Sequence, residues 1–115
     1  MSNINLMGLK DQGEAPISVY PWVISLLGLQ KATLLSVISD SEAPTRELNG
    51  QVFYRFTKPE LNARLPFWKY SNIRDIISQL VKDGFLVAER EHLVTWYAIN
   101  VEALIEAHQA REVAA

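Results

Sequence analysis

The stretch Ser71-Asn72-Ile73-Arg74-Asp75-Ile76-Ile77-Ser78-Gln79-Leu80-Val81-Lys82-Asp83-Gly84 decides the fold. Its large apolar residues recur at the spacing of one helical face, namely Ile73, Ile76, Ile77, Leu80 and Val81. Ser71 suits the N-cap position, and Gly84 suits the left-handed residue that closes a helix. Burying each such aliphatic side chain contributes roughly 1.5–3 kcal/mol. We therefore predict a packed helix between Ser71 and Gly84 with a polar outer face.

A second, shorter helix is expected directly before it. Thr57 is placed to cap this helix, and Glu60 completes the pattern of a capping box. The helix should run from Lys58 to Leu65 and end at Pro66, because proline restricts the residue before it. A short helix, a tight turn and a longer amphipathic helix form the helix-turn-helix pattern.

The N-terminal part of the chain predicts two more helices and a strand. Pro21 to Leu27 reads as a short helix with proline at its first position. Leu29 to Ser39 reads as another, and Gly28 is either a break between the two or a tolerated kink. Arg46 to Gly50 is predicted as a turn and Gln51 to Phe56 as a strand.

The C-terminal part predicts a hairpin and a last helix. Phe85 to Glu89 and Val94 to Ile99 read as strands joined by the loop Arg90 to Leu93. Asn100 is expected to cap a helix from Val101 to about Ala110. The order of these predicted helices and strands along the chain predicts an α+β, mostly α fold. It is that of a winged helix-turn-helix with an extra N-terminal helix and a C-terminal helix.

Length and composition agree with one soluble domain. The chain has 115 residues, which suits a single core. We expect a flexible arm at residues 1–15, a winged-helix domain at 16–110 and a disordered tail at 111–115. The sequence has no cysteine, which excludes disulfides, thiolate zinc sites and cysteine nucleophiles. No secretion signal or spanning segment is evident, so a cytoplasmic protein is expected.

The net charge is −2, yet the charge is unevenly distributed. Residues 52–83 carry six basic and three acidic groups, a balance of +3 around the central helix. Both flanks are acidic, with −2 before this segment and −3 after it. A local excess of this size attracts phosphate only within a Debye length of roughly 8–10 Å. Binding to nucleic acid through it should be weak and sensitive to salt.

Several motifs resemble the winged-helix domains of phage and plasmid replication proteins. They are Tyr54-Arg55-Phe56-Thr57, Leu65-Pro66-Phe67-Trp68, Ser71-Asn72-Ile73-Arg74, Leu80-Val81-Lys82-Asp83-Gly84-Phe85-Leu86 and Thr95-Trp96-Tyr97-Ala98-Ile99-Asn100. Such domains are similar to the N-terminal domain of DnaD-type replication initiators. The resemblance implies DNA-associated work in origin or primosome assembly, or in regulation of a mobile element. It implies that the helix after Ser71 enters the major groove and that the hairpin tip touches the DNA backbone or minor groove.

The predicted DNA-binding residues combine the polar helix face with nearby cations and the hairpin tip. They are Lys58, Arg64, Lys69, Tyr70, Ser71, Asn72, Arg74, Ser78, Lys82, Arg90 and His92. Three features depart from a strong DNA binder: Asp75 on the helix face, Glu89 and Glu91 in the wing, and the acidic overall balance. Trp68 and Trp96 are interpreted mainly as core residues rather than base-stacking groups.

A different class of function fits the same sequence. The acidic flanks and the N-terminal arm also suit a protein-interaction module that forms a homodimer or docks on a partner in a replication or host complex. The sequence shows no catalytic constellation, phosphate loop or metal-ligand spacing, so we expect no enzyme, cofactor, metal or small-molecule substrate.

Overall fold

The computed structural model describes residues 17–114, which form five helices and a four-stranded antiparallel sheet. The fold is therefore α+β, and its helices hold more residues than its strands, as predicted. The helices are α2 (Pro21–Leu27), α3 (Leu29–Ser39), α4 (Lys58–Arg64), α5 (Tyr70–Lys82) and α6 (Val101–Ala114). The strands are β1 (Thr45–Leu48), β2 (Gln51–Thr57), β3 (Leu86–Glu91) and β4 (Val94–Ile99), and their order in the sheet is β1-β2-β4-β3.

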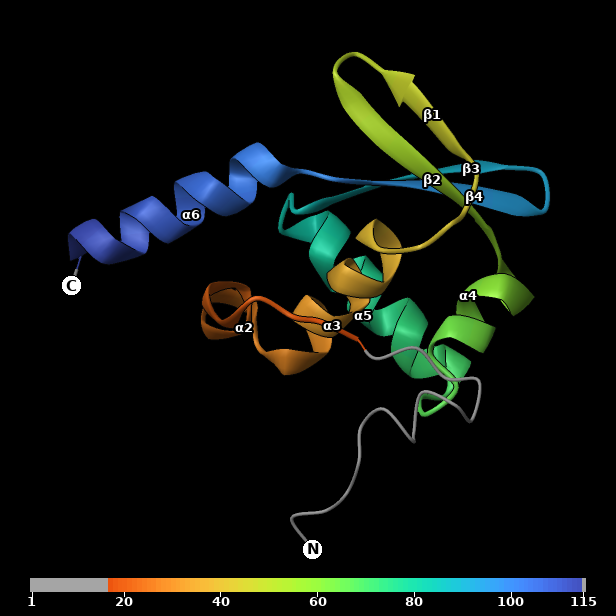
Figure 1. The fold of residues 1–115 in the computed structure, drawn as a ribbon, viewed down its shortest axis with the longest axis horizontal. Helices are drawn as coiled ribbons and strands as arrows, with labels where there is room; N and C mark the ends of the chain where they lie inside the picture. Colours follow the sequence, from red (N-terminus) through yellow and green to blue (C-terminus); the bar gives the residue numbers. More distant parts are fainter. Residues whose placement is uncertain (1–16, 115) are drawn as a thin grey trace, which may run out of the picture.

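The helices α2 to α5 lie on one side of the sheet, and α6 extends beyond the end of the sheet, where it contacts α2 (Figure 1). The main core lies between this helical layer and the sheet, where α5 contacts both α3 and β3. Its fully buried large side chains are Leu34, Ile38, Leu65, Ile73, Leu80 and Leu86. The apolar stripe of α5 therefore faces inward at Ile73, Ile76 and Leu80, whereas Val81 remains 41% exposed at the edge of that stripe.

A smaller apolar cluster lies on the other face of the sheet. It consists of Phe53, Trp96 and Ala98, with Val87 packed against it. The register pairs Phe53 with Ala98 and Arg55 with Trp96, so these side chains share one face. The helices instead pack against the face that carries Tyr97, which belongs to the main core. Trp96 is thus a buried residue, as the sequence predicts.

The two N-terminal helices have the predicted bounds, and the role of Gly28 is now decided. Gly28 has φ +92°, a conformation that favours glycine, and it separates α2 from α3. The break lets the two helices pack against each other.

The beginning of α5 differs from the prediction. Ser71 is not the N-cap, because the helix starts at Tyr70 and Lys69 is the extended residue before it, without a side-chain cap. The end is as predicted: the Gly84 amide donates to the Val81 carbonyl at 3.1 Å and the Phe85 amide to the Leu80 carbonyl at 3.0 Å. This pair of bonds is a Schellman motif with Gly84 at φ +84°.

Both predicted turns are shorter than expected. Residues 46–48 are not turn but part of strand β1, and only Asn49 and Gly50 form the turn, both with positive φ. This geometry matches a two-residue hairpin loop. Likewise Arg90 and Glu91 belong to strand β3, and the turn is made at His92 and Leu93, with His92 at φ +57°.

The last helix is longer than predicted. Asn100 caps α6 as expected, because its side-chain oxygen accepts from the Ala103 amide at 3.1 Å. The predicted tail from Arg111 is wrong for residues 111–114, which continue the helix. No glycine or proline interrupts this run, and the Arg111 guanidinium donates to the Ser25 carbonyl of α2. The predicted arm at residues 1–15 and the tail residue 115 lie outside the described residues. Across residues 17–114, no helix combines the length and apolar character needed to cross a membrane.

Candidate nucleic-acid interface

The outward face of α5 carries most of the predicted contact residues. Those on the helix from its second residue onward are all exposed: Ser71, Asn72, Arg74, Ser78 and Lys82. Lys69, directly before the helix, is exposed as well. Asp75 is exposed on the same face, between Ser71 and Ser78. The face thus offers hydrogen-bond donors suited to phosphates and base edges, interrupted by one carboxylate.

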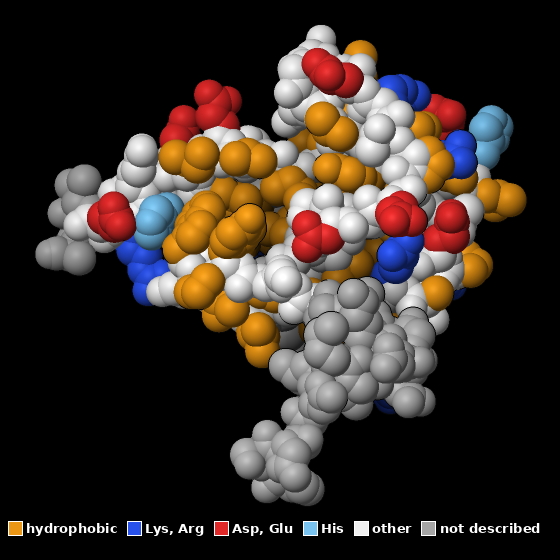
Figure 2. Space-filling model, in the orientation of Figure 1, with side chains coloured by type: hydrophobic (Ala, Val, Ile, Leu, Met, Phe, Trp, Pro, Cys, Tyr) orange, Lys and Arg blue, Asp and Glu red, His pale blue; other side chains and the backbone are white. Residues whose placement is uncertain are grey.

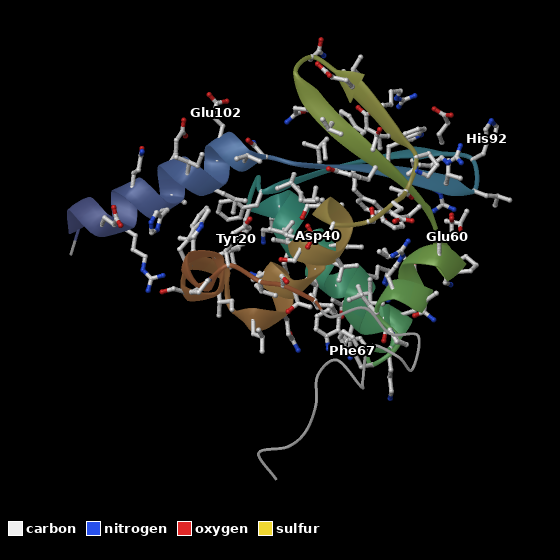
Figure 3. The ribbon with its side chains drawn as sticks, viewed as in Figure 1. Tyr20, Asp40, Glu60, Phe67, His92 and Glu102 are labelled. Carbon is white, nitrogen blue, oxygen red and sulfur yellow. The ribbon has the colours of Figure 1, made fainter. Side chains whose placement is uncertain are left out.

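A pocket of about 190 Å³ lies where α4, the beginning of α5 and the β3–β4 hairpin meet. It brings together three predicted contact residues from three elements: Lys58, Tyr70 and Arg90. Figure 3 shows Glu60 of α4 and His92 of the hairpin turn at this same end of the molecule. The hairpin therefore lies next to the beginning of α5.

Local contacts fix the side of the pocket formed by α4. Thr57 caps the helix by accepting from the Glu60 amide at 3.2 Å, and the Glu60 carboxylate accepts from the Thr57 amide at 2.8 Å. This capping box is the one predicted from the sequence. It places Lys58 at the first turn, where its ammonium lies 4.1 Å from the centre of the Tyr70 ring. That cation–π contact links α4 to the first residue of α5.

Strand alternation separates the charges of the hairpin. Arg90 pairs across the ladder with Thr95, which in turn pairs with Phe56, so the three side chains point to the helical side of the sheet. Glu89 and Glu91 point to the opposite side, where both approach Arg46, at 4.0 Å and 3.7 Å. The two acidic residues of the hairpin are therefore directed away from Arg90 and from the pocket.

Two titratable groups at this end have shifted pKa values. Burial raises the pKa of the Tyr97 hydroxyl, and a hydrogen bond with Thr95 and the charge of Arg90 oppose this shift more weakly. Tyrosine is protonated at neutral pH even without such a shift, so the Tyr97 hydroxyl can donate a hydrogen bond. The pKa of Glu60 is lowered, first by its hydrogen bond with the Thr57 amide and then by that with the Thr57 hydroxyl.

Eight of the eleven predicted contact residues do not line the pocket, among them Arg64, Lys82 and His92. Lys82 is twelve residues after Tyr70 on α5, which is about 18 Å along a helix axis. Arg64 is exposed at the last turn of α4. His92 projects from the hairpin turn (Figure 3), and its carbonyl accepts from Arg90 Nε at 3.3 Å. These residues extend a surface around the pocket rather than line it.

Sequence reasoning missed the strand residues that complete the pocket, Thr95 and Tyr97. Their alternation with Trp96 is visible in the sequence, but the sequence does not indicate which face of the strand meets the helices. It also missed Arg46, whose guanidinium lies 4.2 Å from the Trp96 ring centre. The sequence places Arg46 in a turn, where it has no predicted partner.

A second surface feature is apolar. A pocket of about 760 Å³ lies between α2, α3 and the beginning of α6, and Tyr20, Trp22 and Leu104 are among its lining residues. Figure 2 shows hydrophobic side chains gathered around a hollow over this region. Val101 and Ile105 of α6 are 56% and 43% exposed. His108 of α6 packs on Trp22, one of the lining residues, with their ring centres 4.9 Å apart.

No group of three or more metal-binding side chains occurs within residues 17–114. Among known proteins, no family model and no curated protein matches this chain. Among solved structures, the chain is similar to a transcriptional regulator of the CRP/FNR family from Thermus thermophilus, with 17% identity and a TM-score of 0.49. The match covers 95% of this chain and 52% of the regulator, so the chain spans about half of the regulator's length. The resemblance to DnaD-type and other replication proteins gains no support from these comparisons.

Proposed function

We propose that this chain is a winged-helix DNA-binding protein that acts in replication initiation, primosome assembly or regulation of a mobile element. In this proposal α4 and α5 are the two helices of a helix-turn-helix, and the β3–β4 hairpin is the wing. The observation that carries it is the meeting of Lys58, Tyr70 and Arg90 beside the exposed polar face of α5.

The dimensions and charge of α5 suit a groove. The helix has 13 residues, so it is about 20 Å long, and a major groove about 12 Å wide admits one helix. Arg74 and Asn72 on its exposed side can donate to base edges. Lys69 comes just before its first residue, where it can meet a phosphate.

The same charges predict a weak interaction. The net charge is −2, and Asp75 repels phosphate from the middle of the helix face. Asp75 can still accept from the exocyclic amine of cytosine. We therefore expect a weak affinity for DNA. This affinity should fall as salt rises, because it depends on contacts between cations and phosphates.

Fluorescence anisotropy with labelled duplex and single-stranded DNA at two salt concentrations tests this proposal. We expect binding at low salt that weakens as salt rises, and a large loss of affinity in Lys69→Glu and Arg74→Glu. Both side chains are exposed, so circular dichroism should show both variants folded. Arg55→Glu, a charge reversal at an exposed residue whose side chain is on the opposite face of the sheet, is the charge control. Absence of salt-dependent binding by the unmodified chain would refute the proposal.

The second candidate is a protein-interaction module, favoured by the apolar pocket between α2, α3 and α6. Exposed apolar surface of this kind commonly marks interaction sites. Multi-angle light scattering of the purified chain tests self-association through it. If this candidate is right, the chain elutes as a dimer and Val101→Glu makes it monomeric. Leu93→Glu, at the 84% exposed leucine of the hairpin turn, leaves it a dimer. A strict monomer at high concentration would exclude the homodimer.

A further inference from the structure

We propose that the pocket between α4, α5 and the β3–β4 hairpin binds a single phosphate group of the nucleic-acid backbone. This inference rests on the proposed function. The pocket would hold one phosphate in a fixed position, which the open face of α5 does not do. The polar residues that line this pocket include Lys58, Tyr70, Arg90, Thr95 and Tyr97.

Two cations enter this pocket from different elements. Lys58 comes from the first turn of α4, and Arg90 comes from strand β3. Their positions are held: the Lys58 ammonium lies against the Tyr70 ring at 4.1 Å, and Arg90 Nε donates to the His92 carbonyl at 3.3 Å. Arg90 keeps its terminal guanidinium nitrogens for an anion, which suits the forked geometry of phosphate recognition.

Hydroxyl groups line the space between the cations. Tyr70 and Thr95 contribute to the wall, and Tyr97 lies deeper, only 8% exposed. The Tyr97 hydroxyl is protonated at neutral pH, as tyrosine ordinarily is, so it can donate to an anion. Burial raises its pKa further. Tyr70 is also the first residue of α5, whose beginning has no side-chain cap and no acidic residue in its first turn. The helix dipole therefore adds to the positive potential there.

The neighbouring carboxylates do not occupy the pocket. Glu89 and Glu91 are directed to Arg46 on the opposite face of the sheet. Glu60 uses one carboxylate oxygen to accept from the Thr57 amide. Among the described residues, neither Lys58 nor Arg90 forms an ion pair with a carboxylate. Both cations are thus available to an incoming anion.

The volume of the pocket limits the size of the ligand that it can hold. At about 190 Å³ the pocket is below the range of roughly 300–1,000 Å³ typical of sites for drug-sized ligands and cofactors. A phosphate group, with its charge matched by Lys58 and Arg90, fits this polar and compact space. A nucleotide base does not need two cations. The apolar side chains Phe56 and Leu61 of the lining are only 3% and 2% exposed, so they offer a base little surface to contact.

The test measures how affinity for a fluorescent DNA duplex depends on salt in four single variants of the full chain. Lys58→Ala and Arg90→Ala each remove one cation from the pocket. Each should reduce the slope of log K against log salt by about one. Tyr97→Phe removes a donor without changing charge, and should lower affinity about tenfold with the slope unchanged. Arg55→Ala removes a cation from the opposite face of the sheet and should change neither quantity. Thermal unfolding verifies that each variant is folded.

The outcomes separate this inference from the proposed function. If the unmodified chain binds DNA but the three pocket variants behave like Arg55→Ala, the pocket is overturned and the α5 interface stands. If the slopes fall but Tyr97→Phe binds normally, the cations make ordinary surface contacts and the pocket is again overturned. If the unmodified chain does not bind DNA at low salt, the proposed function fails and this inference fails with it.

Discussion

Arg46 shows at the scale of one residue how this protein separates its charges. Its guanidinium lies 4.2 Å from the Trp96 ring centre and approaches Glu89 and Glu91. It therefore covers an aromatic residue and holds two carboxylates on the face of the sheet away from the candidate interface. Without this arrangement the acidic residues would weaken the field of Arg90.

We expect Arg46→Ala to lower the free energy of unfolding by about 1 kcal/mol. Most of this loss should come from the cation–π contact and from the exposure of Trp96, because ion pairs between side chains that are 40% to 59% exposed contribute little. Urea unfolding followed by tryptophan fluorescence measures it. Arg55→Ala is the matched control, since Arg55 lies 5.9 Å from the same ring centre. Equal losses in the two variants would show that Arg46 has no special role.

Glu60 gives the protein a pH dependence of known sign. Its pKa lies below its ordinary value of 4.5 because the folded state stabilises the carboxylate through Thr57. The contribution of the Glu60 carboxylate to the free energy of unfolding is therefore complete above its pKa in the unfolded state. It is lost as the pH falls through its pKa in the folded state.

Between about pH 6 and pH 3, Glu60→Gln should consequently lose less thermal stability than the unmodified chain does. At neutral pH the variant should be modestly less stable, because a neutral amide accepts more weakly than a carboxylate. Melting temperatures measured across this range test the prediction. If the melting temperatures of the two proteins fell in parallel with pH, the Glu60 carboxylate would not titrate as described.

At the scale of elements, the helices were predictable because short-range signals fix their ends. Pro21 and Gly28 bound α2, Thr57 and Glu60 start α4, and Gly84 ends α5. The prediction failed at Ser71, because a good capping residue does not prevent the chain from entering the helix two residues earlier, with Lys69 at the N-cap position. It also failed at β1, whose four residues Thr45-Arg46-Glu47-Leu48 carry too much charge to read as a strand.

The candidate site was only partly predictable. Its cations follow from charge and motif position, but the pocket depends on which face of β4 meets the helices. Trp96, Tyr97 and Ala98 are all buried, so alternation of polar and apolar residues, the usual signal for strand sidedness, is absent there. The approach of Lys58 to Tyr70 depends on the packing of α4 against α5, which no local pattern specifies.

The end of α5 permits a direct test at this scale. Gly84 has φ +84° and open space around its α-carbon. Gly84→Ala should therefore destabilise the fold by about 1–2 kcal/mol through backbone conformation alone. Ser78→Ala, at an exposed position of the same helix, should be neutral or slightly stabilising. Chemical denaturation measures the free energy of unfolding of both variants. An unchanged value in Gly84→Ala would contradict the Schellman motif at the end of α5.

At the scale of the whole molecule, two surfaces of different character lie on separate elements. The polar surface is formed by α4, α5 and the β3–β4 hairpin, and the apolar pocket is formed by α2, α3 and the beginning of α6. Figure 1 shows the hairpin tip and α6 at opposite ends of the molecule. The separation allows one surface to bind DNA while the other contacts a protein, so the two candidate functions are compatible in one chain.

The most direct test of the DNA-binding account is an NMR titration of the isotopically labelled chain with a short DNA duplex at low salt. The account predicts shifts in the backbone amides of Lys58, Lys69 to Arg74 and Arg90 to Leu93, and their reversal when salt is added. Shifts confined to α2 and α6, or no shifts at all, would contradict it.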